Sequence, residues 1–321
     1  MIANREIETI SRQTLHALQK ERLAKTVHWL WEKSDFYRTR MEAVYSDEKD
    51  VQPETLAKLP LTRRSDLEKE APYGMLTFPI TTVERIHILA GQSGHLAACY
   101  TNGDIAKWME LITRPLLAGG MNVTTIVGMV SDYGVNPDGL ALHYGTEVIG
   151  ATTIPLPANI YRQVEAVKKM SITALAGSIE DLVQLGHALY GRGNIEQIFA
   201  VMRAGEEALA EELATLYTGK ITKILAVDEV MGAGVAFDCG DGWHLAEDAF
   251  YTEVVDAEGN AVPDGVCGQL VLTTLVREAM PLLRYATGIE GVLTRETCEC
   301  GRTTARFHVK KANNEKSCRT D

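Results

Sequence analysis

The feature that most constrains this chain is an alternation of short apolar runs with amphipathic segments through its centre. Three runs have the length and composition of buried strands: 124–130, 198–202 and 221–227. Helical patterns occur among and after these runs at 140–144, 163–169, 179–189 and 206–216. Residues 147–154 are predicted as a further strand. Such alternation predicts an α/β fold with largely parallel sheets flanked by helices.

Different patterns flank this core. Apolar residues at three- and four-residue steps predict helix over residues 7–45. Beyond residue 235, the runs 250–256 and 269–274 are separated by turn-forming residues, which predicts an antiparallel or barrel-like β-rich section. We therefore expect a helical and loop segment at 1–80, an α/β core at 81–234, the β-rich section at 235–309 and a polar tail at 310–321.

Charge and composition exclude several classes of function. The 321 residues carry 32 Lys and Arg against 43 Asp and Glu, a net charge of −11, without the basic tracts that a nucleic-acid partner requires. The N-terminus lacks the apolar run of a secretory signal. The most apolar stretch, 115–130, is interrupted by polar residues and is shorter than the roughly 20 residues of a membrane span. We expect a cytoplasmic protein without a membrane partner, whose cysteines are thiols or metal ligands.

A glycine-bearing segment at 89–96 is the first candidate site. Gly91, Ser93 and Gly94 could present backbone N–H groups to a phosphate. No Lys follows them in P-loop spacing, however, and His95 stands where the hydrolase pattern G-x-S-x-G requires glycine. From this segment alone, a plain surface loop is the favoured interpretation, and a hydrolase using Ser93 with His95 or His87 is a weak alternative.

Four residues in the β-rich section form a candidate metal site. Cys239 and His244 flank a glycine-containing turn, and Cys298 and Cys300 form a short knuckle. Three thiolates and one imidazole are a set that tetrahedral structural Zn²⁺ accepts. Two unrelated cysteine-bearing turns would give the same pattern. The other cysteines lack such companions and are expected to be buried or incidental thiols: Cys99, Cys267 and Cys318.

Asp228 and Glu229 follow the predicted strand 221–227 directly. Carboxylates at the end of a strand in an α/β sheet commonly face the ligand crevice and can hold Mg²⁺. A solvated acidic turn is the alternative interpretation of these two residues.

Several segments in the same order resemble one family. The chain resembles the adenylation domain of phenylacetate-CoA ligases, within the AMP-forming acyl-CoA ligases, from its N-terminal helix to about residue 306. The segments that carry the resemblance are 34–38, 59–62, 72–74, 85–87, 139–145, 232–236, 272–275, 280–285 and 298–302.

The resemblance implies an activity and a set of ligands. Members of the family join a carboxylate to ATP with Mg²⁺ and then pass the acyl group to coenzyme A. The resemblance also implies structural Zn²⁺ at Cys239, His244, Cys298 and Cys300. The ligand that it implies is a small aryl or acyl carboxylate, or its CoA ester. A homodimer or protein partner is also expected. The residues expected to border the acyl pocket are Tyr133, Asn136 and His143.

The nucleotide-binding positions depart from the family pattern. Glu229 keeps the Mg²⁺-binding carboxylate, whereas Asp228 replaces a phosphate donor and His95 replaces the Lys of the phosphate loop that includes Gly91, Ser93 and Gly94. Ile289 replaces the Asp that holds the ribose hydroxyls, and an alkyl side chain accepts no hydrogen bond. Each such loss is expected to cost about 2–4 kcal/mol in binding. Gly205 and Glu207 belong to a motif that is only partly retained.

Two hypotheses follow from the resemblance. The mobile C-terminal lid domain of the family, with its adenylation Lys, is expected to be absent. The favoured hypothesis is a degenerate phenylacetate-CoA-ligase-like protein with little ATP-dependent ligase activity of its own. The alternative is an active AMP-forming aryl- or acyl-CoA ligase, completed in trans by a separate lid domain.

Overall fold

The computed structural model describes residues 1–90, 95–131, 133, 137–191 and 193–310. The chain divides into two compact units. The first comprises Met1–Asn4, Trp108–Val227 and Gly232–Trp243, and the second comprises Arg5–Lys107, Asp228–Met231 and His244–Asp321. Across the described residues, no helix combines the length and the apolarity needed to cross a bilayer.

The first unit is built on a mostly parallel sheet with the strand order β4-β3-β5-β6-β7-β8. Neighbours from β4 to β7 pair in parallel, and β8 is antiparallel to β7. This confirms the predicted α/β architecture. The strands are β3 (Ile126–Val130), β4 (Thr152–Pro155), β5 (Ala174–Ser178), β6 (Gln197–Met202), β7 (Lys220–Val227) and β8 (Gly232–Asp238). The helices are α5 (Asn102–Gly119), α6 (Pro137–Ile149), α7 (Ile160–Lys169), α8 (Ile179–Leu189) and α9 (Glu207–Leu216).

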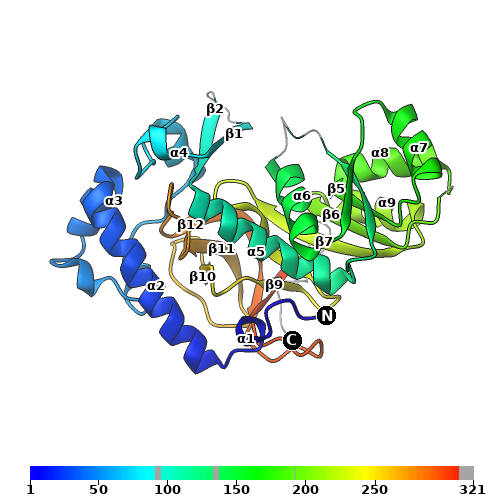
Figure 1. Cartoon of the computed structure of the whole chain (residues 1–321). Coiled ribbons are helices and arrows are strands. Elements are labelled where there is room, and N and C mark those ends of the chain that lie inside the picture. Colours follow the sequence, from blue (N-terminus) through cyan, green and yellow to red (C-terminus); the bar gives the residue numbers. More distant parts are fainter. Residues whose placement is uncertain (91–94, 132, 134–136, 192, 311–321) are drawn as a thin grey trace. The chain divides into compact units, whose positions relative to one another are not determined.

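The strand order of this unit creates a topological switch point. The chain passes from β3 to β4 in one direction and then crosses back to β5 on the other side of β3. Right-handed crossovers therefore place α6 on one face of the strands and α7, α8 and α9 on the other (Figure 1). Ligands of open α/β sheets commonly bind outside the carboxyl ends of such diverging strands. A cavity of about 140 Å³ at this edge is lined by Val130, Ser131, Ala158, Ile160, Gln163, Asp181 and Gln184.

The second unit combines N-terminal helices with antiparallel strands. A hairpin pairs β1 (Arg85–Ala90) with β2 (His95–Tyr100). A second group of strands has the order β10-β11-β12-β13-β9, and its antiparallel pairing from β10 to β13 confirms the predicted β-rich section. Its strands are β9 (Trp243–Leu245), β10 (Phe250–Val255), β11 (Cys267–Thr274), β12 (Tyr285–Thr294) and β13 (Arg306–Val309). The helices are α1 (Arg5–Glu8), α2 (Arg12–Lys33), α3 (Asp35–Glu42) and α4 (Arg64–Lys69).

The single helix predicted over residues 7–45 is instead split into α2 and α3. Ser34 ends the first and begins the second. Its backbone N–H donates to the carbonyl of Leu30 at 3.0 Å, and its hydroxyl accepts from the backbone N–H of Tyr37 at 3.3 Å. A serine with extended backbone geometry caps a helix better than it continues one.

The strand predicted over residues 147–154 is wrong for its first half. Residues 147–149 are the last turn of α6, and β4 begins only at Thr152. Gly150 has φ +84°, the left-handed conformation that ends helices, and its N–H donates to the carbonyl of Glu147 at 2.9 Å. The β-branched Val148 and Ile149 suggested a strand, but this glycine ends the helix, and the strand begins five residues later than predicted.

The cysteines of the described chain fall into two groups. Cys99, Cys239, Cys298 and Cys300 are thiols rather than disulfides. Cys267 is disulfide-bonded. The expectation of a thiol at Cys267 is therefore wrong.

A buried guanidinium organises the core of the second unit. Arg284 is 2 % exposed, and its N–H groups donate to the carbonyls of Ala57, Leu59 and Gly259 at 2.8, 2.5 and 2.8 Å. The carboxylate of Glu253, also buried, lies 3.1 Å from it. Burial raises the pKa of Glu253, and the charge of Arg284 opposes that shift. The arginine thus holds two loops against β10 and β12.

Replacing Arg284 with methionine should lower the free energy of unfolding by about 3–5 kcal/mol, because it leaves the buried Glu253 carboxylate without its counter-charge. Urea titration followed by circular dichroism measures this. The matched control is Arg295→Met. That arginine forms an exposed ion pair with Asp264, whose loss should cost less than about 1 kcal/mol. Equal losses in the two variants would contradict the organising role of Arg284.

Candidate functional site

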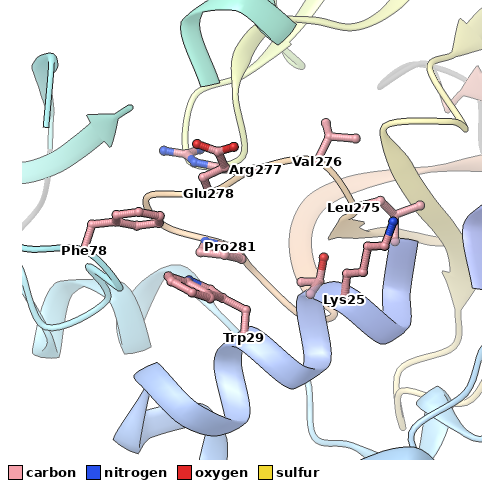
Figure 2. A pocket seen from close by; sticks show the side chains of 9 residues that line it. Lys25, Trp29, Phe78, Leu275, Val276, Arg277, Glu278 and Pro281 are labelled. Carbon is pink, nitrogen blue, oxygen red and sulfur yellow. The ribbon is translucent and has the colours of Figure 1, made fainter. Parts of the chain in front are cut away.

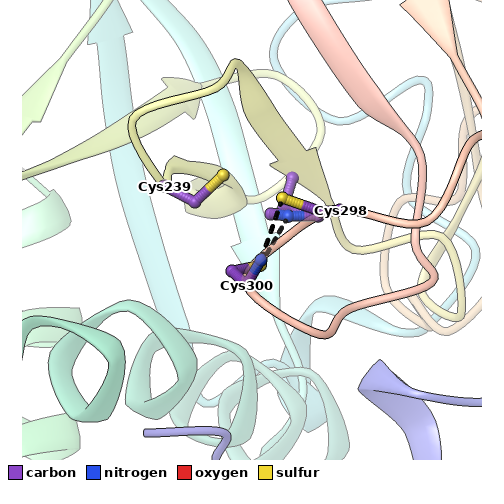
Figure 3. A group of neighbouring side chains, drawn as sticks. Cys239, Cys298 and Cys300 are labelled. Carbon is purple, nitrogen blue, oxygen red and sulfur yellow. Dashed lines mark hydrogen bonds between the residues drawn. The ribbon is translucent and has the colours of Figure 1, made fainter.

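The predicted metal-binding residues lie together. One ligand atom from each of Cys239, His244, Cys298 and Cys300 falls within 4.8 Å of the others (Figure 3). The backbone N–H of Cys239 donates to the carbonyl of Gly242 at 3.3 Å, which closes a local turn before His244. The backbone N–H of Gly301 donates to the carbonyl of Cys298 at 2.9 Å and folds the knuckle. Thiolates held about 2.3 Å from a tetrahedral Zn²⁺ lie roughly 3.8 Å apart, close to this spacing.

The hydrogen bonding of His244 suits a metal ligand. Its Nδ1 lies 3.1 Å from the carbonyl oxygen of Thr304, which can only accept, so Nδ1 carries the proton. Nε2 then offers a lone pair, 3.2 Å from Sγ of Cys300. Burial, followed by the charge of Arg302, lowers the pKa of His244 to about 4, so the imidazole is neutral at pH 7.

The thiol of Cys300 is biased toward the thiolate. Burial alone would raise its pKa, but hydrogen bonds from Arg302 and Cys298 and the charge of Arg302 lower it overall. Metal ligation by cysteine requires the thiolate. A neutral imidazole and a stabilised thiolate therefore give this cluster the donor chemistry of a Cys₃His site, and the described residues could hold a metal ion.

Glu229, the predicted Mg²⁺-binding residue, is engaged within the second unit. Its carboxylate forms an ion pair with Arg64 of α4, and its side chain is 8 % exposed. Arg277 donates to the backbone carbonyl of Glu229 at 2.9 Å. Burial and the Glu229 carboxylate raise the pKa of the neighbouring Tyr285 phenol. Arg64 was not identified from the sequence, because its partner lies far along the chain.

Ile289, at the predicted ribose-binding position, is an ordinary core residue of β12. It is 5 % exposed, and its backbone N–H donates to the hydroxyl of Thr287 at 3.1 Å. The preceding Gly288, inside β12, has φ +78°, and no atom lies within 4 Å of where its Cβ would be. Asp228 is half-buried in the short segment that also carries Glu229.

Gly205 lies in the loop before α9 of the first unit, and Glu207 is the first residue of that helix. Gly205 has φ +93°, and its backbone N–H donates to the carboxylate of Glu207 at 3.3 Å. Arg203 on the same loop donates to the buried carboxylate of Asp138 at 2.7 Å. The loop is therefore tied to the start of α6.

The predicted phosphate loop is described only at its edges. Gly91, Ser93 and Gly94 lie outside the described residues. The backbone of His95 opens β2 opposite Ala90. Within β1, His87 is 7 % exposed, and its ring meets that of Tyr100 edge-on at 5.6 Å. Burial, followed by the charge of Arg85, lowers the pKa of His87 to about 4.

Two of the three predicted acyl-pocket residues are in contact. The hydroxyl of Tyr133 lies 3.0 Å from Nδ1 of His143, and Nε2 of the same imidazole lies 3.2 Å from the carboxylate of Glu147. Burial, followed by the charge of Glu147, raises the pKa of Tyr133 to about 12, so its phenol stays protonated. Asn136 lies outside the described residues.

A cavity of about 370 Å³ lies within the second unit (Figure 2). Trp29 and Phe78 form one wall, with ring centroids 5.0 Å apart, and Pro281 lies beside them. Trp29 donates from Nε1 to the hydroxyl of Thr77 at 2.9 Å, which fixes its ring. The cavity has the size of a small-ligand pocket and was not anticipated from the sequence. The remaining lining residues are Lys25, Thr26, Leu275, Val276, Arg277 and Glu278.

Comparisons with known proteins identify relatives over nearly the whole chain. A phenylacetate-coenzyme A ligase of Thermus thermophilus is 34% identical over 320 residues, which cover 96% of this chain and 72% of that protein. The corresponding ligase of Escherichia coli is 32% identical over 296 residues, covering 88% and 68% of the two chains. No protein-family model matches the chain.

Solved structures support the fold. An open conformation of 2-hydroxyisobutyryl-CoA ligase, in complex with 2-HIB-AMP and CoA, superposes with a TM-score of 0.85 at 20% identity. The match covers 94% of this chain and 75% of that one. It confirms the expected architecture of a CoA-ligase adenylation domain.

The low pKa of His87 predicts a pH-dependent stability. In the unfolded chain His87 binds a proton near pH 6.5, whereas in the folded chain it does so only near pH 4. Stability should therefore fall as the pH drops from 7 to 5, by about 2 kcal/mol from this residue. Urea unfolding at both pH values measures the change, and His87→Gln should remove the part of it that comes from this residue. The exposed His187, substituted in the same way, should leave the pH dependence intact, and identical pH dependence in wild type and H87Q would contradict the assignment.

Proposed function

Since the chain belongs to the phenylacetate-coenzyme A ligase family, we propose that it is an adenylation-domain protein of that family with little ATP-dependent ligase activity of its own. The observation that carries this proposal is Ile289. It is a buried alkyl side chain at the position where the family pattern has the ribose-binding Asp. A buried isoleucine offers neither charge nor acceptor to two ribose hydroxyls.

The surroundings of Glu229 support the same proposal. A carboxylate that binds Mg²⁺ must turn its oxygens toward the ion, whereas this one is held by the Arg64 guanidinium. Asp228, next to it, adds a negative charge where the family has a hydroxyl donor. Both features disfavour the binding of a nucleoside triphosphate, which is itself strongly anionic.

The retained Glu229 also favours a second candidate function. If Arg64 turned away on nucleotide binding, the carboxylate would be available to Mg²⁺. The protein would then be an active AMP-forming ligase that joins an aryl or acyl carboxylate to CoA with release of AMP and pyrophosphate.

Under either function, the ligand class is a small aryl or acyl carboxylate or its CoA ester. Tyr133 and His143 supply a hydroxyl and an imidazole at the expected acyl pocket.

The two functions predict different results when ATP binding is measured by calorimetry. We expect no heat of binding when ATP with Mg²⁺ is titrated to about 1 mM, and no AMP or pyrophosphate after incubation with arylacetates and CoA. The triple variant Ile289→Asp, Asp228→Thr, His95→Lys returns three family residues and should bind ATP measurably. The control variant Ile289→Leu should show no heat of ATP binding. Micromolar binding of ATP by the wild-type protein would overturn the proposal.

We further propose that the Cys₃His cluster holds a structural Zn²⁺. The ion would be bound by Cys239, His244, Cys298 and Cys300, and four protein ligands leave no open position for a substrate. The Zn²⁺ ion would cross-link the turn that carries Cys239 and His244 to the knuckle that carries Cys298 and Cys300, and it would take no part in catalysis.

Purified protein should contain about one zinc per chain by atomic emission spectrometry. Chelation should lower the melting temperature by about 5–10 °C, because the site contributes folding energy. Adding Zn²⁺ back, but not Mg²⁺, should reverse the change. Cys300→Ser should lose the metal, whereas Cys99→Ala, which alters a cysteine outside the cluster, should retain it. A zinc-free protein with an unchanged melting temperature would contradict this proposal.

A further inference from the structure

Arg302 links the metal cluster to the N-terminus of the chain. It follows the knuckle directly, and its Nη1 donates to Sγ of Cys300 at 3.5 Å. On its other side, Nε donates to the carboxylate of Glu8 in α1 at 2.5 Å. The guanidinium is thus held between a predicted metal ligand and a carboxylate almost 300 positions earlier in the sequence.

This link is buried and reinforced. Glu8 is 2 % exposed and Arg302 is 4 % exposed. The backbone N–H of Thr303 donates to the carbonyl of Glu8 at 3.0 Å, and its hydroxyl donates to the carbonyl of Ile10 at 2.6 Å. The N-terminal segment 5–10 therefore docks on the loop between the knuckle and β13.

The charges of the three groups explain why a buried ion pair is retained here. A Zn²⁺ bound by three thiolates and one neutral imidazole carries a net charge of −1. The Arg302 guanidinium compensates that charge, and Glu8 in turn compensates and orients the guanidinium. A buried pair that served only stability would gain little over apolar residues, whereas one that balances an anionic cluster supports the ligands themselves.

We propose that Arg302 and Glu8 are positioning residues of the metal site, so that metal binding and docking of the segment 5–10 stabilise each other. The inference rests on the proposed Zn²⁺ site. Arg302 donates to the Cys300 thiolate, and Glu8 fixes the geometry of that donor. Neither residue contacts the ion.

The first test measures metal affinity by competition with a chromophoric zinc chelator. Glu8→Gln and Arg302→Lys should each weaken Zn²⁺ binding about 10–100-fold, because a lost outer hydrogen bond costs that much at comparable sites. The matched control is Glu6→Gln, an exposed acid on the same short helix, which should bind as tightly as the wild type. Affinities of E8Q and R302K within twofold of the wild type would overturn the proposal. A wild-type protein that binds no zinc would instead overturn the metal site itself.

The second test needs no variant and so does not depend on the substitutions folding. Hydrogen exchange of the peptide covering residues 5–10 is followed in the wild-type full chain, with zinc and after chelation. Exchange of this peptide should accelerate at least tenfold when the metal is removed, while that of α8 stays unchanged. Equal exchange of residues 5–10 in both states would overturn the coupling.

Discussion

The packing of the second unit depends on the buried charge of Arg284. Arg284 is buried, so each of its N–H groups requires an acceptor, and the structure supplies three carbonyls and one carboxylate. Those acceptors come from the 57–59 turn, the Gly259 turn and β10. Arg284 directly precedes β12, which contains Tyr285 and Ile289. The placement of these β12 residues therefore follows from satisfying this guanidinium.

Local patterns predicted most of the first unit. Residues 179–189 and 206–216 were expected as helices and form α8 and α9 to within one residue. Buried strands of a parallel sheet are continuous apolar runs that such reasoning detects. It failed at residues 147–149, where β-branched side chains suggested a strand and a left-handed Gly150 set the end of α6. It also missed β5, because 174–178 is too rich in small residues to stand out.

The candidate site also has a part that could be predicted from the sequence and a part that could not. Cys298 and Cys300 are close in sequence, so their shared geometry could be predicted, and the count of three thiolates and one imidazole joined them to Cys239 and His244 before the family resemblance supported the set. The partners of these residues could not be predicted. Arg64 with Glu229 and Glu8 with Arg302 are pairs formed only by the tertiary fold. No spacing in the sequence indicates that a given arginine will meet a given glutamate.

The division of the chain has a consequence for biosynthesis. Most of the first unit is one continuous stretch, whereas the second is assembled from segments on both sides of it. On the ribosome, the N-terminal helices must wait for the final strands, a delay of about 10–40 s at ordinary elongation rates. The continuous unit can fold during that interval. Apolar side chains of α2 remain exposed meanwhile, which makes the nascent N-terminal third a natural client for chaperones.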